Sequence, residues 1–371
     1  MAKKSTAQPE DITETLEPME ARLAKELPRG TGWQFEPKWD GFRCLAFRWP
    51  MGAAGSGERI ELRAKSGKSL SRFFPEVLQR LQAVPHDRFV LDGELVIPVG
   101  PALSFDALQM RLHPAQSRIQ RLARETPATL IAFDCLLGID GTNLLNEPLS
   151  VRRNALEQLF GADGDPIAPG LLLSPYTRKH AEAQKWLDRA QGALDGVVAK
   201  RIDAPYLPGE RAMIKVKPLR TADVVVGGFR YGVNSDEVGS LLLGLYNDAG
   251  QLDHVGFTSS IPRTERAALT RKLEALRGPP GFSGKAPGGP SRWSTERSGE
   301  WEPVKPRLVA EVCYDHVTGD RFRHGTRLLR WRPDKAPRQC TFDQLRAEAR
   351  PAKLVRQVLR PTTQQQVLHE P

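Results

Sequence analysis

The pattern of the sequence changes near Arg220, and this change constrains the fold more than any other feature. Before it, strand-like stretches such as "FRCLAFRW" and "ATLIAFDCLL" mix with helical stretches such as "FPEVLQRLQAV". After it, short strands bounded by Gly, Asn and Asp follow one another, with the single helix "RTERAALTRKLEAL" among them. A mixture of strands and helices predicts an α+β domain, whereas serial short strands predict a small β-barrel. We therefore expect an α+β chain whose second part is a barrel.

The length of 371 residues also fits two domains rather than one. We expect a loose N-terminal segment over 1–17, a first domain over 18–220 and a barrel domain over 221–345. A C-terminal helix and tail should occupy 346–371. Within the first domain, Ser150 is a plausible N-cap for the helix of "SVRRNALEQLF".

Charge and cysteine content exclude several classes of protein. The 54 Lys and Arg residues exceed the 44 Asp and Glu residues, and the net charge of +10 favours an anionic partner such as nucleic acid. The four cysteines lie far apart without a C-x-x-C pair, so we expect free thiols in a reducing cytoplasm rather than a zinc site. There is no run of eighteen apolar residues and no apolar signal sequence, so we expect no contact with a membrane.

The stretch "FEPKWDGFR" contains the most distinctive short motif, a lysine followed by one residue and then Asp-Gly. Lys38 is either a surface lysine beside a turn or a nucleophile whose pKa is depressed by burial or by neighbouring cations. A K-x-D-G pattern should occur by chance in roughly one chain of this length in ten. The motif alone therefore slightly favours a surface lysine beside a turn, without excluding the nucleophile.

Further charged or aromatic residues lie in or beside other apolar strands. Glu94 lies inside "LDGELV", where a buried charge is costly unless it binds something. Each of these residues, taken singly, is more often part of a core or of a solvated edge. Together they would form a nucleotide pocket, with an aromatic for the base, carboxylates for ribose or metal, and cations for phosphate. The set comprises Lys65, Glu94, Phe133, Asp195, Lys200, Lys215 and Lys217.

These stretches occur in an order that resembles a known family. The elements "EPKWDGFR", "LRAKSGK", "LDGELV", "FDALQMRL", "FDCLL", "DGVVAK", "MIKVK" and "RWRPDK" are similar to those of the ATP-dependent DNA ligases. The resemblance is greatest to the short stand-alone bacterial C type and to the ligase module of bacterial end-joining ligases. It implies a nucleotidyltransferase (adenylation) domain of antiparallel sheets and helices, followed by an oligonucleotide-binding (OB) barrel.

The resemblance also implies a role for each matching position. Lys38 would become covalently bound to AMP, while Lys215 and Lys217 would contact the α-phosphate and help to keep Lys38 neutral. Glu94 and Asp195 would bind the metal. The remaining ATP-binding positions are Glu36 at the adenine, Arg43 at the ribose, Phe133 stacked on the base, Lys65, Lys200 and Arg211, and Arg332, Asp334 and Lys335 at the pyrophosphate. Two positions depart from the usual pattern, because Asp195 replaces a glutamate and Lys65 replaces an arginine.

The implied co-substrate is ATP, with Mg²⁺ or Mn²⁺ as the cofactor and nicked duplex DNA as the partner. The implied enzyme is a monomer that seals nicks in DNA repair, recombination or end joining at the bacterial nucleoid. An RNA ligase or a capping guanylyltransferase would share Lys38 and a barrel. A non-catalytic DNA-binding module would need no Lys38 at all.

Overall fold

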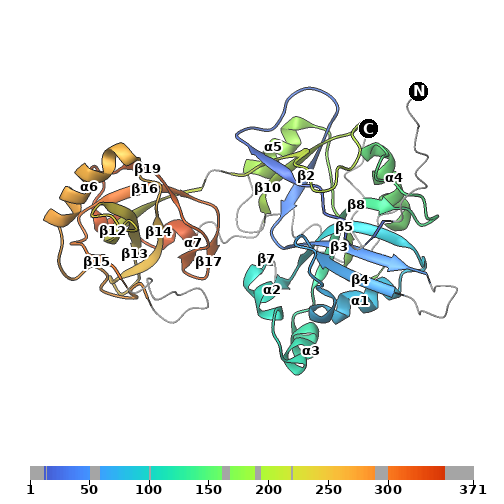
Figure 1. The fold of residues 1–371 in the computed structure, drawn as a ribbon, viewed down its shortest axis with the longest axis horizontal. Coiled ribbons are helices and arrows are strands. Elements are labelled where there is room, and N and C mark those ends of the chain that lie inside the picture. The colour runs from blue at the N-terminus through green and yellow to red at the C-terminus, as the bar shows by residue number, and fades with distance from the viewer. Residues whose placement is uncertain are drawn as a thin grey trace. The chain divides into compact units, whose positions relative to one another are not determined.

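The computed structural model describes residues 12–13, 15–50, 59–99, 102–160, 168–188, 194–218, 220–288 and 300–346. The chain divides into two compact units, of which the first ends at Pro218 and the second follows it (Figure 1). Sheets and helices occur together, so the predicted α+β class is confirmed. In the described part of the chain, no helix is both long enough and apolar enough to cross a membrane.

A five-stranded sheet forms the centre of the first unit. Its order is β4 (Arg59–Ala64), β3 (Phe42–Trp49), β5 (Phe89–Val96), β8 (Thr129–Leu137) and β9 (Leu171–Leu173). Successive side chains of a strand point to opposite faces, so alternate residues such as Cys44 and Ala46 face one core. Three helices contribute to that core: α1 (Pro75–Gln82), α2 (Phe105–Arg111) and α4 (Leu149–Phe160).

The opposite face of this sheet packs against the N-terminal part of the chain. Leu45 and Phe47 lie in one apolar cluster with Ile12, Leu16 and Met19. Within the segment that was expected to be loose, Ile12 is buried and Leu16 packs beside it. The preceding residues, 1–11, lie outside the described part of the chain.

A four-stranded sheet separates an apolar face from a charged one. Its order is β1 (Ala21–Ala24), β11 (Met213–Val216), β10 (Leu194–Arg201) and β2 (Trp33–Trp39). Phe35, Val197 and Ile214 pack against α5 (His180–Asp188) on one face. The alternate positions, which include Lys38 and Lys200, point to the other face. The strand pattern therefore directs the charged residues away from α5.

The second unit is a sheet that returns on itself. Its strands follow the order β14 (Leu252–Thr258), β13 (Val238–Tyr246), β12 (Arg220–Tyr231), β16 (Val309–Tyr314) and β19 (Arg327–Trp331), and β15 (Glu302–Pro303) also pairs with β12. A bridge between Thr258 and Thr326 joins the end of β14 to the start of β19. The backbone N–H of Thr326 donates to the oxygen of Phe257 at 2.9 Å. These contacts close the strands into the expected small barrel, whose core also takes residues from α6 (Arg263–Ala275).

Several elements differ from the expectations or were not foreseen. Helix α4 begins at Leu149, so Ser150 lies inside the helix and is not its N-cap. Additional elements are α3 (Gln116–Glu125), the hairpins β6 (Pro98–Val99)–β7 (Ala102–Leu103) and β17 (Val317–Thr318)–β18 (Arg321–Phe322), and short 3₁₀ turns at Ser71–Phe73 and Pro337–Gln339. The last described helix is α7 (Asp343–Arg346). The expected C-terminal helix and tail lies outside the described residues beyond Arg346.

A buried ion pair anchors α4 to the central sheet. Arg152 on α4 binds Asp134 on β8 through two hydrogen bonds of 2.8 and 3.1 Å, and both side chains are about 1% exposed. Arg152 also donates to the backbone oxygens of Glu147 and Ala204. Removing one partner of such a pair leaves the other charge without compensation in a medium of low dielectric constant.

We predict that Arg152→Leu lowers the free energy of unfolding of the first unit by about 3–5 kcal/mol. Urea unfolding followed by circular dichroism measures the change. The matched control is Arg121→Leu, since Arg121 forms an exposed pair with Glu125 on α3, and exposed pairs contribute less than about 1 kcal/mol. Equal effects of the two substitutions would contradict the prediction.

His254 gives the barrel a dependence on pH. Its side chain is buried, its Nδ1 lies 3.1 Å from a guanidinium nitrogen of Arg321, and its Nε2 has no hydrogen-bond partner among the described residues. Burial, together with the charges of Arg321 and Arg230, lowers the pKa of His254 to about 3. In the unfolded chain the pKa of His254 is near 6.5. Below that pH, His254 therefore binds a proton in the unfolded chain but stays neutral in the folded barrel.

We predict that the protein loses about 2 kcal/mol of stability through His254 between pH 7.5 and pH 5, at 1.36 kcal/mol per pH unit below 6.5. Stability rises with pH through this window because the unfolded state binds more protons. Urea unfolding of wild type and His254→Gln at both pH values tests the prediction. A wild type and a variant with the same pH dependence would refute it.

Candidate functional site

The pairing of β2 with β10 places Lys38 beside an acid. Lys38 lies opposite Gly196, and Trp39 lies opposite Leu194, so Asp195 is an extra residue in a β-bulge. A bulge re-aims the side chain that it carries. The Asp195 carboxylate lies 2.5 Å from Lys38 Nζ and 3.0 Å from Lys217 Nζ. One carboxylate thus holds both the predicted nucleophile and one of the two lysines predicted to contact the α-phosphate.

The backbone at Gly196 allows this approach. Gly196 has a φ of +130°, and a Cβ atom built there would lie 2.1 Å from the backbone oxygen of Val216. A larger residue would push β10 away from β11, because an L-residue is strained in this region and backbone atoms cannot yield. Glycine at this position therefore keeps Lys217 close to Asp195.

The charges around Lys38 favour its protonated form. Burial lowers the pKa of Lys38, but the carboxylates of Asp195, Glu94 and Asp40 outweigh burial and raise it above the ordinary value. The expected effect of the neighbouring lysines, which is to keep Lys38 neutral, is therefore smaller than the effect of the three carboxylates. The pKa of Lys215, in contrast, is lowered, first by burial and then by the positive charges of Lys38 and Lys217.

Glu94 lies on β5, opposite Arg43 on β3. Its Oε1 accepts a hydrogen bond of 3.1 Å from the backbone N–H of Gly41. Burial raises the pKa of Glu94 to about 7, although Lys38 and Arg43 act in the opposite direction. A partly buried carboxylate whose pKa is raised in this way gains from the arrival of a cation.

Phe133 is the extra residue of a second bulge, in β8. Asp134 pairs with Asp92 and Ala132 pairs with Gly93, which leaves Phe133 between the two pairs. The Arg43 guanidinium lies 4.6 Å from the centre of the Phe133 ring, and Lys200 Nζ lies 4.7 Å from it. The ring is buried at 8% exposure, and its contacts with cations are of the type that stabilises by about 1–2 kcal/mol in partly dry surroundings.

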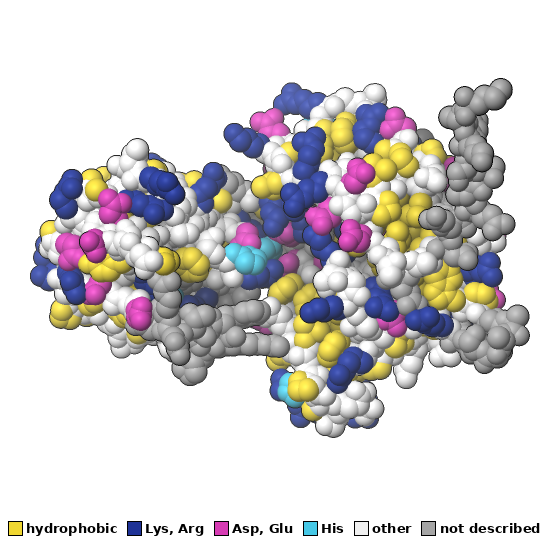
Figure 2. Space-filling view, viewed as in Figure 1, with side chains coloured by type: hydrophobic (Ala, Val, Ile, Leu, Met, Phe, Trp, Pro, Cys, Tyr) yellow, Lys and Arg dark blue, Asp and Glu magenta, His cyan; other side chains and the backbone are white. Residues whose placement is uncertain are grey.

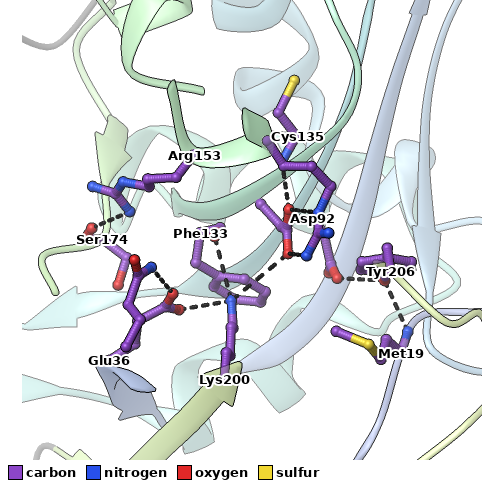
Figure 3. Close-up of polar contacts among 12 residues, drawn as sticks. Met19, Glu36, Asp92, Phe133, Cys135, Arg153, Ser174, Lys200 and Tyr206 are labelled. Atoms are coloured by element: carbon purple, nitrogen blue, oxygen red, sulfur yellow. Dashed lines mark hydrogen bonds and ion pairs between the residues drawn. The ribbon is translucent and has the colours of Figure 1, made fainter. Parts of the chain in front are cut away.

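Lys200 connects the two sheets of the first unit. Its ammonium lies 2.8 Å from Glu36 on β2 and 3.9 Å from Asp134 on β8, and it donates to the backbone oxygen of Phe133 at 3.4 Å. Figure 3 shows Lys200 pointing between Glu36 and Phe133. The Glu36 carboxylate also accepts a hydrogen bond of 2.9 Å from Gln34. Glu36 and Lys200 are both buried, so this ion pair holds the two side chains in place beside the ring of Phe133.

Arg43 is held by a second buried network. It donates to both oxygens of Asp92, at 2.5 and 2.6 Å, and to the backbone oxygen of Met19 at 3.1 Å. The hydroxyl of Tyr206 donates to Asp92 at 2.6 Å and accepts from the backbone N–H of Met19 at 2.8 Å (Figure 3). This network secures the chain before β1 against the central sheet, next to the predicted ribose-side arginine.

A third group lies nearer the surface. The carboxylate of Glu20 lies 2.9 Å from Lys65 Nζ and 3.7 Å from Arg211 Nε. Lys65 and Arg211 are largely exposed, and both Glu20 and Lys65 also act electrostatically on Lys215. Figure 2 shows Lys and Arg side chains gathered with Asp and Glu side chains on the face of the first unit that it presents.

The structure thus brings most of the predicted residues of the first unit together. Lys38, Asp195, Glu94, Lys215 and Lys217 form one charged group. A second group surrounds the ring of Phe133 and comprises Glu36, Arg43 and Lys200. It is connected to the charged group through the interaction of Arg43 with Glu94. Arg332, Asp334 and Lys335 belong to the second unit, where Asp223 binds Arg332 and Lys335.

Four residues of these networks were missed by the sequence reasoning: Glu20, Asp92, Tyr206 and Asp223. Asp92 had a visible signal, because it interrupts a strand that is otherwise apolar. Glu20, Tyr206 and Asp223 had no such signal, since their partners lie far away in the sequence.

Comparison with known proteins gives a consistent result. The family model described as the ATP dependent DNA ligase domain matches residues 5–217, and that of the ATP dependent DNA ligase C terminal region matches residues 234–335. DNA ligase C1 of Mycolicibacterium smegmatis is 42% identical over 341 residues, which cover 89% of this chain and 93% of the relative.

The end-joining protein LigD of Mycobacterium tuberculosis is 30% identical over 336 residues, which cover 89% of this chain and 38% of that protein. A solved Lig E DNA ligase is 19% identical, covers 85% of this chain and 100% of its own, and has a TM-score of 0.52, which shows a shared fold. With both family models matching in order, the chain belongs to the ATP-dependent DNA ligases, built from a nucleotidyltransferase domain and an OB domain.

Proposed function

We propose that this ligase seals nicks in duplex DNA through an AMP intermediate on Lys38. The observation that carries the proposal is the position of Lys38, which is only partly exposed and lies within one charged group with Asp195, Glu94 and Lys217. A lysine beside a turn on a solvated surface would not need these partners. A covalent amine in a phosphate site does need them, since phosphoryl transfer depends on positioning and charge neutralisation.

The reaction proceeds in three transfers. The deprotonated amine of Lys38 attacks the α-phosphorus of ATP, forming an N–P bond while the bond to the leaving pyrophosphate breaks. An oxygen of the 5′-phosphate at the nick then attacks the same phosphorus, and the N–P bond breaks. Finally the 3′-hydroxyl loses its proton and attacks the activated 5′-phosphate, releasing AMP and joining the strands.

The surrounding side chains divide the binding of ATP among them. Phe133 stacks on adenine in place of one of its present cation contacts, and Glu36 contacts the edge of the base. Arg43 contacts the ribose, and Lys215 contacts the α-phosphate together with Lys217. Lys65 and Arg211, which now share Glu20, contact phosphate at the outer side. The cations Arg332 and Lys335 act with Asp334 on the pyrophosphate.

The donors present fit Mg²⁺ or Mn²⁺. The described residues contain no group of three or more potential protein ligands, but Glu94 and Asp195 both act electrostatically on Lys38. Mg²⁺ is commonly held by one or two carboxylates, with water and substrate phosphates completing its shell. Glu94 and Asp195 would hold the ion, which when bound neutralises charge on the phosphates.

The net charge of +10 suits a duplex DNA substrate, which would be bound mainly through its phosphates and without base readout. We propose a monomer that acts on chromosomal DNA at the bacterial nucleoid, in repair, recombination or end joining. The Lys-x-Asp-Gly motif alone would suit an RNA ligase or a guanylyltransferase equally well, but both family models are those of DNA ligases.

We predict that Lys38→Ala abolishes the covalent AMP adduct without unfolding the protein, because the other amines of this group, Lys215 and Lys217, contact the α-phosphate and do not attack it. Incubation with ATP labelled at the α-phosphate, followed by a denaturing gel, measures the adduct. Lys25→Ala is the matched control, since Lys25 is exposed and should leave labelling unchanged. An adduct of wild-type intensity on Lys38→Ala would exclude Lys38 as the nucleophile.

We also predict that the adduct forms with ATP at least about 100-fold faster than with GTP, because a polar site rejects a base whose groups it cannot pair. The wild-type protein should then seal a nick between two DNA strands. The measurements are labelling with either nucleotide and ligation of nicked duplexes made from DNA or RNA strands. A preference for GTP, or sealing confined to RNA, would support a different lysyl-nucleotidyltransferase.

A further inference from the structure

The second unit contains a buried acid that the proposed chemistry does not use. Asp223 lies on β12 and is 8% exposed. Its two carboxylate oxygens accept hydrogen bonds of 2.8 and 3.0 Å from Nη1 of Arg332, and Oδ2 lies 2.6 Å from Lys335 Nζ. These are two of the three residues that the ligase motif assigns to the pyrophosphate.

The backbone of Asp223 is itself held in place. Its N–H donates to the side-chain oxygen of Gln344 at 2.9 Å, and its C=O accepts from the amide nitrogen of Gln344 at 3.1 Å. In the backbone pairing of β12 with β16, Asp223 lies opposite Glu311. The carboxylate therefore projects from a backbone that both a strand neighbour and α7 fix, which makes it a rigid support for the two cations.

The remaining edge of the Arg332 guanidinium faces outward. Nε and Nη2 bind the carboxylate of Asp334, with distances of 3.0 Å from Nε to Oδ1 and 2.8 Å from Nη2 to Oδ2. Asp334 is 62% exposed, whereas the side chain of Asp223 is 11% exposed. The exposed carboxylate occupies the edge that would receive a phosphate in the same fork geometry. An oxyanion can thus replace Asp334 while Asp223 stays in place.

We propose that Asp223 is a positioning residue for the first step of ligation. It holds Nη1 of Arg332 and one donor of Lys335, so that the outer edge of the guanidinium, once released from Asp334, and the other ammonium donors are available to the pyrophosphate of ATP. Asp223 does not touch the nucleotide, and it acts only through Arg332 and Lys335. The inference rests on the proposed function, because it assumes that ATP loses pyrophosphate to Lys38.

The test compares two steps of the same reaction in the full-length protein. Asp223→Asn should slow AMP labelling of Lys38 by roughly 10- to 100-fold, the cost of misplacing a reacting group. The reverse reaction, loss of AMP from the adenylylated protein on addition of pyrophosphate, should slow as well. Sealing of a nick that already carries 5′-AMP should keep its wild-type rate, because that step involves no pyrophosphate.

A double-mutant cycle shows whether the effect passes through Arg332. Adding Asp223→Asn to Arg332→Gln should cost little beyond Arg332→Gln alone, since interacting residues are not additive. Glu311→Gln is the matched control, because Glu311 lies opposite Asp223 but pairs with the exposed Arg330, and labelling should be unchanged.

Two results would overturn the proposal. Equal slowing of labelling and of sealing at the pre-adenylylated nick would assign Asp223 a structural role, and unchanged or faster labelling would remove any role in the first step. The wild-type reaction provides the separate check on the proposed function. If the wild type forms no AMP adduct at all, the function fails independently of Asp223.

Discussion

The first unit depends on the register between β2, β10 and β11. In that register the alternate residues of all three strands divide between an apolar face under α5 and a face that carries Glu36, Lys38, Lys200 and Lys215. A slip of one residue would exchange the two faces and bury every charge. The two demands are linked, because the apolar contacts that stabilise the sheet also select the face on which the chemistry takes place.

The cations of the protein occur in one recurring arrangement, in which a carboxylate lies between two basic groups. Asp195 holds Lys38 and Lys217, Glu20 holds Lys65 and Arg211, and Asp223 holds Arg332 and Lys335. Each acid lowers the repulsion that would otherwise oppose gathering cations at one place. The arrangement allows the cations of a phosphate site to lie close together without a phosphate. The carboxylate that makes this possible then competes with phosphate for the same cations.

Sequence reasoning identified the strands and charged positions of the site because each lies inside a short, periodic stretch. The spacing of Lys215 and Lys217 predicted that both lie on one side of a strand; Lys215 lies on β11, Val216 after it is buried, and Lys217 follows the end of the strand. Two features of the site could not be predicted from the sequence. The bulges at Phe133 and Asp195 follow from how two distant strands pair, and the protonated state of Lys38 follows from acids contributed by other strands. The start of α4 was misplaced because a local capping preference at Ser150 yielded to packing around Leu149.

The paired acids also affect how the protein responds to ionic strength. Binding of DNA weakens with salt in proportion to the counterions that leave when basic groups neutralise phosphates. A cation that already has a carboxylate partner holds few mobile ions, so its transfer to a phosphate releases fewer of them. Exchange of a carboxylate for a phosphate is a substitution of one anion for another. The salt dependence of this ligase should therefore be shallower than its 54 Lys and Arg residues suggest.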